Sequence, residues 1–479
     1  MPNPHPLLTS VFAGKIGLAR EDITPPIEIY SRSWGAATHD IAAGVHRPLT
    51  VTALALVSAD GPPLILIATD LGWWKNSVDE WFVRGAVLDA LHLPAERLLI
   101  SLSHTHAGPS LSRDDGDKPG GALIAPYLLT LRDRIIRAAR AALASSRPAL
   151  LSWRYGQCNL AHNRDLPEAD TTRHVVGYNP NEPADDTVLV GRIEEPGSGR
   201  ILATIVNYAC HPTTLAWDNR LLSPDYPGAM REVVETVTGA PCLFLQGASG
   251  ELAPAEQYVG DAAVCDRHGR RLGHAVLSVL ESWSEASMVF DRVVESGAAL
   301  AVFRPEPPAT SGELRADLRP IELALKPLPS LAEIEEKWRN CTDRTLRERL
   351  WRQRGIRKTV GDGTTAAMPL WTWRIGEALI IAQPNEAYSQ LQSELRHRFR
   401  PRPVIVLNVT NGYAGYLPPR THYTRDQYSV WQSPFAAGAL ENVIETAKTS
   451  SQALLNPSTD PLPTSANDDK HRATTASSS

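Results

Sequence analysis

Two histidines one residue apart, His104 and His106, follow an apolar run of the chain. In extended backbone, side chains two residues apart point to the same face, so we expect both rings to reach one cleft. Neutral imidazole is a strong zinc ligand and titrates near neutral pH, which suits metal binding or proton transfer. Two hydrogen-bonded histidines in a polar loop are the alternative, and the pair alone does not decide between these roles.

A third histidine, His211, follows a run of β-forming residues and precedes Pro212, which stops the strand. Taken alone, it is more typical of a structural residue. Polar side chains follow several predicted strands, however, and sites in α/β proteins collect at strand ends. The residues in question are Asp70, His104, His106, Asn163, Arg164, His211 and Asp225. Their positions predict a site built from several strand ends.

The elements that must position these residues alternate in an α/β rhythm. Short aliphatic runs predict strands, and longer stretches with apolar residues at helical spacing predict helices. We expect strands at 64–68, 97–101, 149–155, 201–208, 242–245, 378–382 and 403–409. We expect helices at 78–91, 127–144, 228–237, 262–283 and 386–398. The pattern predicts an α/β fold.

Two regions depart from this rhythm. Residues 303–330 are rich in proline and suit an edge strand, and residues 331–357 predict a pair of charged helices that form an insertion or lid at about 330–360. From residue 456 onward the chain has almost no large apolar residue, so burial cannot offset its ordering entropy. We therefore expect one domain over residues 1–455 and a disordered tail at 456–479.

The composition narrows the class of protein. With 43% apolar and 21% charged residues, the 479-residue chain is typical of a globular protein, and its formal charge of −5 offers no basic surface for nucleic acid. No apolar run reaches the roughly 18 residues of a membrane span, so we expect no stable membrane insertion. The five cysteines are odd in number and include no C-x-x-C pair, which argues against disulfides and a cysteine zinc site.

The start of the chain bears on its location. Residues 1–14 lack the apolar run of a signal peptide. Together with the cysteine pattern, this predicts a cytoplasmic protein. The expected partner is a small-molecule substrate, and the sequence leaves a homo-oligomer open.

Several motifs occur together in one order along the chain. They are His-Thr-His-Ala-Gly-Pro at 104–109, Asn-Arg at 163–164, His-Pro-Thr at 211–213 and Asn-Gly-Tyr-Ala-Gly-Tyr at 411–416, followed by Tyr423 and Tyr428. With these motifs the chain resembles the neutral/alkaline non-lysosomal ceramidase family over residues 14–440. The resemblance implies the fold of that family's catalytic domain, with mixed β-sheets layered with helices.

The resemblance also implies roles for individual residues. It assigns zinc ligation to His104, His211, Glu386 and Tyr416. Two imidazoles and one carboxylate suit zinc, and an open position can then hold water. It further implies that His106 is an acid-base group, and that Arg164 and Tyr428 donate hydrogen bonds to the substrate oxygen.

The chain departs from the family at the reacting hydroxyl. Where the family has Gly-Asp-x-Ser-Pro, this chain has Gly-Glu-Leu-Ala-Pro at 250–254, so Ala253 stands in the place of the serine. Ser249 lies nearby, but its surroundings lack the last glycine of a G-x-S-x-G elbow, and we interpret it as a loop serine. The family's secretory start and C-terminal β-sandwich domain are also expected to be absent.

These residues predict a zinc-dependent hydrolase that cleaves an amide bond, or an ester or lactone, of a soluble small molecule by metal-activated water. One alternative is a ceramidase-like lipid amidase. Others are a metal-dependent isomerase or lyase and a metal-stabilised binding protein. Tryptophans near the motifs are either pocket walls or core residues: Trp34, Trp73, Trp74 and Trp217.

Overall fold

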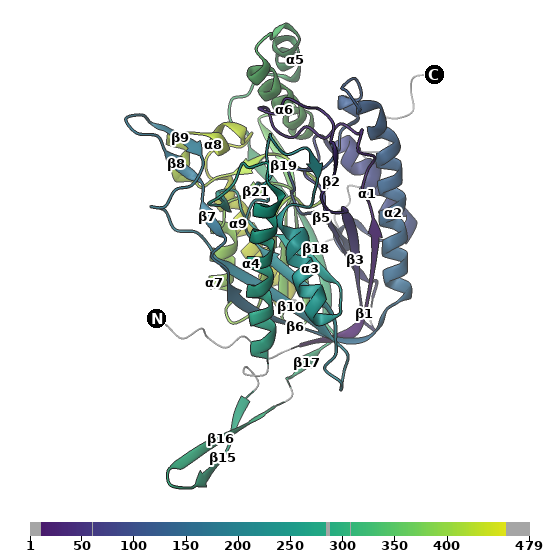
Figure 1. Cartoon of the computed structure of the whole chain (residues 1–479), viewed down its shortest axis with the longest axis vertical. Helices are drawn as coiled ribbons and strands as arrows, with labels where there is room; N and C mark the ends of the chain where they lie inside the picture. The colour runs from purple at the N-terminus through teal and green to yellow at the C-terminus, as the bar shows by residue number, and fades with distance from the viewer. Residues whose placement is uncertain (1–10, 60, 284–287, 307, 457–479) are drawn as a thin grey trace.

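The structure is a computed structural model, which describes residues 11–59, 61–283, 288–306 and 308–456. Within these residues two β-sheets share one apolar core and carry helices on their outer faces, which gives four layers (Figure 1). This confirms the expected α/β fold with mixed sheets layered with helices. The predicted disordered tail at 456–479 lies, apart from Asn456, outside the described residues.

The larger sheet follows the order β13-β11-β10-β6-β1-β3-β4-β5, with a short parallel strand, β17, added to β1. The pairs β11–β13 and β4–β5 are parallel and the pairs between them are antiparallel, so the sheet is mixed. The strands are β1 (Val11–Asp22), β3 (Thr50–Val57), β4 (Leu64–Thr69), β5 (Leu98–Leu102), β6 (Arg147–Gln157), β10 (Thr187–Glu194), β11 (Ile201–Tyr208), β13 (Cys242–Gln246) and β17 (Thr310–Ser311).

The smaller sheet follows the order β18-β19-β20-β22. Its strands are β18 (Leu314–Ala324), β19 (Thr365–Ile375), β20 (Ala378–Ala382) and β22 (Val404–Leu407), of which β20 and β22 are parallel. Trp371 and Trp373 of β19 are buried in the core that the two sheets share. The edge strand expected in residues 303–330 is confirmed, because β18 is an edge of this sheet.

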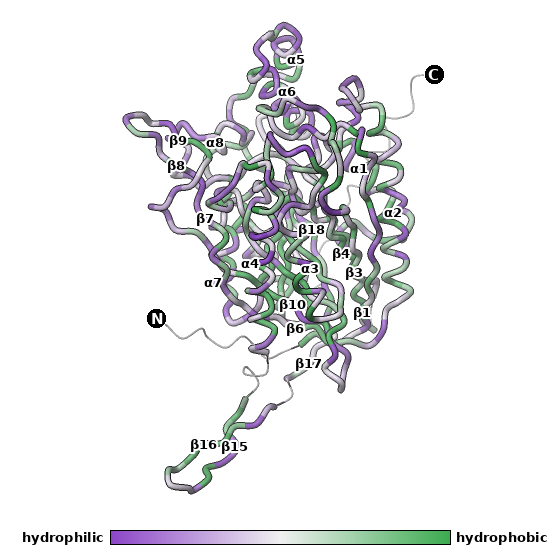
Figure 2. Tube along the Cα trace, viewed as in Figure 1, coloured by the Kyte–Doolittle hydropathy of each residue, from purple (hydrophilic) through white to green (hydrophobic). Residues whose placement is uncertain are grey.

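Alternation along the strands directs side chains to different layers. In β3 and β4 the alternate residues Leu54, Leu56, Leu64 and Leu66 face the smaller sheet, and the residues between them face the outer helices. Figure 2 shows hydrophobic residues concentrated along these inner strands. Both faces of the larger sheet are therefore covered.

Helices cover the outer faces of both sheets. On the larger sheet, α1 (Ser77–Leu91) and α2 (Ile124–Ala144) cover one half, and α3 (Tyr226–Thr238) and α4 (Ala262–Glu281) cover the other. On the smaller sheet, α7 (Gln390–Arg398) and α9 (Ala439–Leu455) form the outer layer. None of the helices in the described ranges is both long enough and apolar enough to cross a bilayer.

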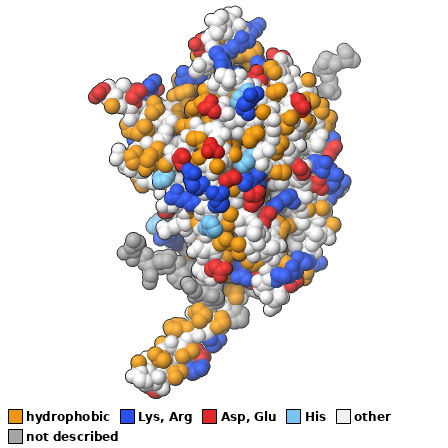
Figure 3. Space-filling view, in the orientation of Figure 1, with side chains coloured by type: hydrophobic (Ala, Val, Ile, Leu, Met, Phe, Trp, Pro, Cys, Tyr) orange, Lys and Arg blue, Asp and Glu red, His pale blue; other side chains and the backbone are white. Residues whose placement is uncertain are grey.

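Two segments extend from this body (Figure 1). The predicted helix pair is present as α5 (Leu331–Asn340) and α6 (Arg344–Val360), inserted between β18 and β19. A hairpin of β15 (Met288–Glu295) and β16 (Ala299–Pro305) projects at the opposite end, and Figure 3 shows hydrophobic side chains along it. Phe290 and Phe303 are among its exposed apolar residues.

Most predicted elements are present with shifted ends, but the helix expected at 386–398 is wrong at its start. Residues Glu386–Ala387 form a short strand, β21, that pairs with β23 (Tyr416–Leu417), and the helix α7 begins only at Gln390. A two-residue strand leaves no periodic pattern, because its pairing depends on a partner some 30 residues away. The correction matters because Glu386 is a proposed ligand.

Candidate metal centre

The four proposed zinc ligands lie beyond the carboxyl ends of strands in both sheets. His104 follows β5 and His211 follows β11, both of the larger sheet. Glu386 lies after β20 and Tyr416 after β22, both of the smaller sheet, and in the parallel pair β21–β23 these two residues are directly opposite each other. The structure therefore brings together four residues that are more than 300 positions apart at the extremes.

The ligand atoms are within a few ångströms of one another and all four side chains are buried. Glu386 Oε2 is 2.7 Å from His211 Nε2 and 3.3 Å from His104 Nε2. Ligands about 2.0–2.1 Å from a tetrahedral zinc stand roughly 3.3 Å apart. The spacing of these nitrogen and oxygen atoms is close to that arrangement.

The hydrogen bonds of the two imidazoles fit a metal. His104 Nδ1 lies 3.2 Å from the carbonyl of Gly72, and His211 Nδ1 lies 2.6 Å from the carbonyl of Ser249. A carbonyl at Nδ1 keeps the proton there and leaves Nε2 free, as in metal-binding histidines generally. Among the described residues, His104 Nε2 has no hydrogen-bond partner although it is buried. The residues present therefore fit zinc.

The acidic ligand is held in its charged form. Burial alone would raise the pKa of Glu386, but the neighbouring His104 and His211 outweigh burial and hold this pKa well below its usual range. The hydroxyl of Tyr413 donates to Glu386 Oε1 at 2.7 Å and fixes the other oxygen. The sequence alone assigns no role to Tyr413, because a tyrosine whose contacts are unknown is typical of a residue that packs in the core.

His106 reaches the same cleft as His104, with ring centroids 5.0 Å apart, but not for the expected reason. The strand ends at Leu102, and His104 has a positive φ of 67°, so the backbone is turned and not extended. A positive φ is uncommon outside glycine and recurs at functional sites. The turn, and not strand alternation, brings the two rings together.

The surroundings of His106 leave it able to exchange a proton. Its ring lies 4.9 Å from both Trp34 and Trp73, measured between ring centroids, and neither ring nitrogen has a hydrogen-bond partner among the described residues. Burial, followed by the nearby His104 and His211, holds the pKa of His106 well below its ordinary value. The nitrogens of all three histidines are also close enough for His106 to act as a further ligand.

Arg164 is buried beside the ligands. One of its terminal nitrogens donates to the carbonyl of Gly250 at 2.8 Å and to the hydroxyl of Tyr416 at 3.0 Å, and lies 3.2 Å from His211 Nε2. Burial would lower its pKa, but Tyr416, Tyr258 and Glu386 raise the pKa above its ordinary value. Arg164 therefore stays charged beside His211 and Tyr416.

Tyr428 begins the short helix α8 (Tyr428–Gln432), and its ring lies 5.6 Å from that of Tyr416. Its hydroxyl oxygen accepts hydrogen bonds from Arg352 at 3.2 Å and from Gln432 at 3.4 Å. Because both bonds are accepted, the hydroxyl hydrogen can be donated to a substrate. Tyr428 lines both cavities, and its role as a donor to the substrate stays a prediction.

The other strand-end residues do not join the site. Asp70 forms a two-bond ion pair with Arg231, at 2.7 Å for each bond. Asp225 caps the start of α3, and the Asn163 side chain accepts from the backbone of Asp165. Polar residues at strand ends also form turns and cap helices. Position at a strand end therefore predicts more site residues than the structure brings together.

Neither Ala253 nor Ser249 presents a hydroxyl to the proposed ligands. Ala253 is buried on β14 (Leu252–Pro254), opposite His162 of β7 (Ala161–Asn163). The side chain of Ser249 is buried and its oxygen accepts from Gln246 at 2.6 Å. Neither Ser249 nor Ala253 lines either of the two cavities beside the proposed ligands.

Two cavities meet at Tyr416 and His106. The first has an empty volume of about 740 Å³, open solvent at its mouth included, and is lined by Trp73, Lys75, Asp114, Arg352, Tyr413 and other residues. The second has an empty volume of about 1710 Å³ on the same measure and is walled by Trp34, Trp217, Tyr258 and Trp431. Trp34, Trp73 and Trp217 are therefore pocket walls, whereas Trp74 is a core residue.

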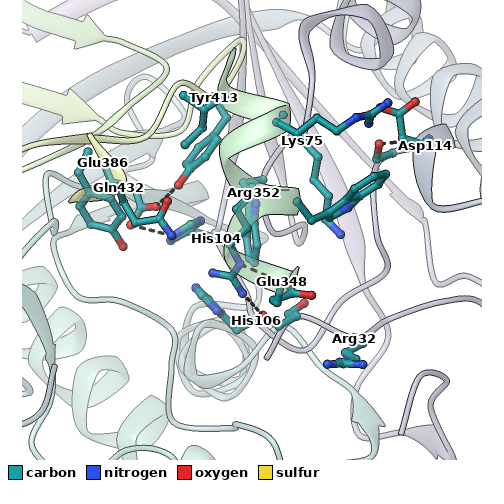
Figure 4. A pocket seen from close by; sticks show the side chains of 18 of the residues that line it. Arg32, Lys75, His104, His106, Asp114, Glu348, Arg352, Glu386, Tyr413 and Gln432 are labelled. Carbon is teal, nitrogen blue, oxygen red and sulfur yellow. Dashed lines mark hydrogen bonds and ion pairs between the residues drawn. The ribbon is translucent and has the colours of Figure 1, made fainter. Parts of the chain in front are cut away.

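The helix α6 closes the site from above the ligands. Figure 4 shows Arg352 and Glu348, both from this helix, beside His104 and His106. His106, Arg352, Tyr416 and Tyr428 line both cavities. The sequence does not single out Arg352, because its position has no feature that distinguishes it from the other arginines of this strongly charged helix.

A second cluster with metal-ligand chemistry comprises His46, Cys265 and Asp266. The guanidinium of Arg47 contacts both His46 and Asp266. A positive group already occupies the position between these ligands. The cluster is therefore an ion pair and not a second metal site.

No protein-family model matches the chain, and no curated protein matches its sequence. Its fold is similar to that of the neutral ceramidase from Pseudomonas aeruginosa, with a TM-score of 0.66 and 18% identity over 92% of this chain and 74% of that one. A ceramidase complexed with C2 matches with a TM-score of 0.66 and 16% identity, over 93% of this chain and 75% of that one. The chain has a neutral ceramidase-like fold.

Proposed function

We propose that this protein is a zinc-dependent hydrolase that cleaves the amide bond of an N-acyl amphiphile. The observation that carries the proposal is the convergence of His104, His211, Glu386 and Tyr416 from four strand ends, where the buried Nε2 of His104 has no hydrogen-bond partner among the described residues. Two imidazoles, a carboxylate and a phenol oxygen form a donor set that suits zinc. The likeness to ceramidase structures supports the choice of an amide.

A lipid-like amide is better supported as the substrate than the soluble molecule expected from the sequence. Both similar structures are ceramidases, and the larger cavity has aromatic walls that an acyl chain can contact. The second candidate is a small amide, ester or lactone. It is favoured by the charged lining of the smaller cavity.

In the proposed mechanism the chain's own residues orient the substrate and move the proton. Zinc, when bound, would polarise the scissile carbonyl and lower the pKa of water. His106 would accept the proton of the attacking water and pass it to the leaving nitrogen. Arg164 and Tyr428 would donate hydrogen bonds to the oxygen that becomes negative. Because Ala253 supplies no hydroxyl, we expect no acyl-enzyme.

The test is hydrolysis of an N-octanoyl amide in water labelled with oxygen-18. We expect the label in the released octanoate, no octanoyl group trapped on any serine, loss of turnover after chelation, and recovery with added zinc. Product without label would favour the isomerase or lyase alternative. Full zinc occupancy without turnover of any amide or ester in a panel would favour a binding protein.

A further inference from the structure

Among the cations of the smaller cavity, Arg32, at 3.5 Å from Asp40, and Arg352 have the longest acidic contacts, and of these two residues only Arg352 also lines the larger cavity. Its Nε lies 3.4 Å from Glu348, and its other contacts are neutral: the carbonyl of Ser33 at 2.8 Å and the hydroxyl of Tyr428 at 3.2 Å. Its side chain is 26% exposed, although it lies above buried metal ligands. Because it lines both cavities, this exposed surface faces the space where a substrate would bind.

Other cations of the same cavity are more closely paired. Lys75 lies 2.7 Å from Asp115, and Arg354 lies 2.9 Å from Asp114 and 2.8 Å from Glu335. Apart from the ligand Glu386, the only acidic residues lining this cavity in the described part of the chain are Asp114 and Glu348, against four cations: Arg32, Lys75, Arg352 and Arg354. Lys75 and Arg354 are neutralised by the partners named above, so Arg352 is the cation of this cavity that faces both cavities and can still receive a negative group.

The two cavities suit opposite ends of one molecule. The larger cavity presents aromatic rings, and the smaller one presents the planar, permanently charged fork of Arg352, which matches a carboxylate in geometry. Of the proposed ligands, Tyr416 lines both cavities, as does His106, and His104 and Glu386 line the smaller one. An amide bond where the two cavities meet would have an apolar group on one side and an anionic group on the other.

We propose that Arg352 binds a carboxylate of the substrate, so that the amide joins an acyl group to an anionic head, as in an N-acyl amino acid. This inference rests on the proposed function and specifies its substrate class. The carboxylate would displace the weak contact with Glu348. The insertion α5–α6 then acts as the part of the fold that selects the head group.

The experiment compares N-octanoylglycine with N-octanoylethanolamine, which differ mainly in the carboxylate. Wild-type protein should show a higher kcat/KM for the glycine conjugate, and Arg352→Gln should lower this preference by about 10-fold to 100-fold, mainly through KM, because a charge-assisted hydrogen bond is worth about 1.5–3 kcal/mol. Arg352→Lys should restore part of it. The matched control is Arg347→Gln on the same helix, since Arg347 stacks on Trp338 and should leave the preference unchanged.

Binding of uncleavable analogues gives a reading that does not depend on turnover. The N-octylsulfonyl derivatives of glycine and ethanolamine are titrated calorimetrically into the protein as purified. Arg352-dependent preference for the glycine derivative, without hydrolysis of either amide, would refute the proposed function and leave this inference standing. Equal binding of the two, the same preference in Arg352→Gln, or a preference for an amine-bearing analogue would overturn the inference.

Discussion

At the residue scale, the proposed metal ligands differ in their hydrogen bonds from the residues that we propose act on the substrate. The Nδ1 atoms of His104 and His211 are engaged by backbone carbonyls, whereas both nitrogens of His106 lack partners among the described residues. Arg164 contacts Tyr416 through its guanidinium but brings a positive charge, which cannot bind a cation. The same cleft thus contains ligands and catalytic groups of different chemistry.

This difference predicts that His106→Ala and Arg164→Ala keep their zinc and lose turnover. Loss of one donor to a developing oxyanion typically costs on the order of a hundredfold in kcat, and loss of an acid-base group a similar factor. Metal analysis and steady-state kinetics on the two variants test it. Zinc loss in His106→Ala would make His106 a ligand, and an unchanged kcat would remove the residue from the mechanism.

A second prediction concerns Glu251, whose carboxylate accepts from the backbone and side chain of Ser389. Burial raises its pKa from the ordinary 4.5 to about 8. Between these values the folded state holds a proton that the unfolded state has released, so this group's contribution to stability is complete below about pH 4.5 and is lost as the pH rises to about 8.

Thermal unfolding of wild type and Glu251→Gln across pH 4 to 9 tests this linkage. The wild-type Tm should fall relative to that of Glu251→Gln as the pH rises through this window, because glutamine cannot ionise. Tm curves that run parallel across the window would show that Glu251 does not titrate there.

At the element scale, the tight approach of α3 and α4 rests on small residues. A Cβ added at Gly269 of α4 would lie 2.5 Å from both the Ala229 side chain and the Tyr226 carbonyl. We predict that Gly269→Ala lowers the free energy of unfolding by about 1–3 kcal/mol, because overpacking outweighs the helix propensity of alanine. Gly297→Ala, with open space around it, is the matched control in urea unfolding. Equal stabilities would contradict the packing argument.

Several elements could be predicted from the sequence because their patterns are local. Burial on one or two faces produces the aliphatic runs of β4 and β20 and the helical spacing of apolar residues in α2. All three elements are present in the structure. The strand β21 could not be predicted, since its two residues pair with β23 only after the chain has folded. The position of α6 over the site could not be predicted either, because helical periodicity does not say which surface a helix will cover.

The residues of the site also divide into those that a local sequence pattern indicates and those that it does not. His104, His211 and Tyr416 belong to motifs that point to a known arrangement, and the structure brings them together with Glu386. Arg352 and Tyr413 contact distant residues; Tyr413 lies in the motif at 411–416, but nothing local indicates its bond to Glu386 or the contact of Arg352 with Tyr428. Asp70 and Asp225 show the opposite error, because a polar residue at a strand end also serves an ion pair or a helix cap.

At the scale of the whole molecule, the proposed metal centre is built from residues of both sheets. His104 and His211 follow strands of the larger sheet, and Glu386 and Tyr416 follow strands of the smaller one. The sheets share an apolar core that includes Trp371 and Trp373. The ligand set is therefore complete only when the two sheets have packed together, which couples metal binding to the tertiary fold.

The zinc content of the purified protein tests the central claim most directly. Protein prepared without chelator should contain one zinc per chain, and His104→Ala and His211→Ala should contain little or none. His162→Ala, which alters a histidine that packs edge-to-face against Tyr178, should keep its zinc as the control. Wild-type protein without zinc, or full zinc in both ligand variants, would contradict the account.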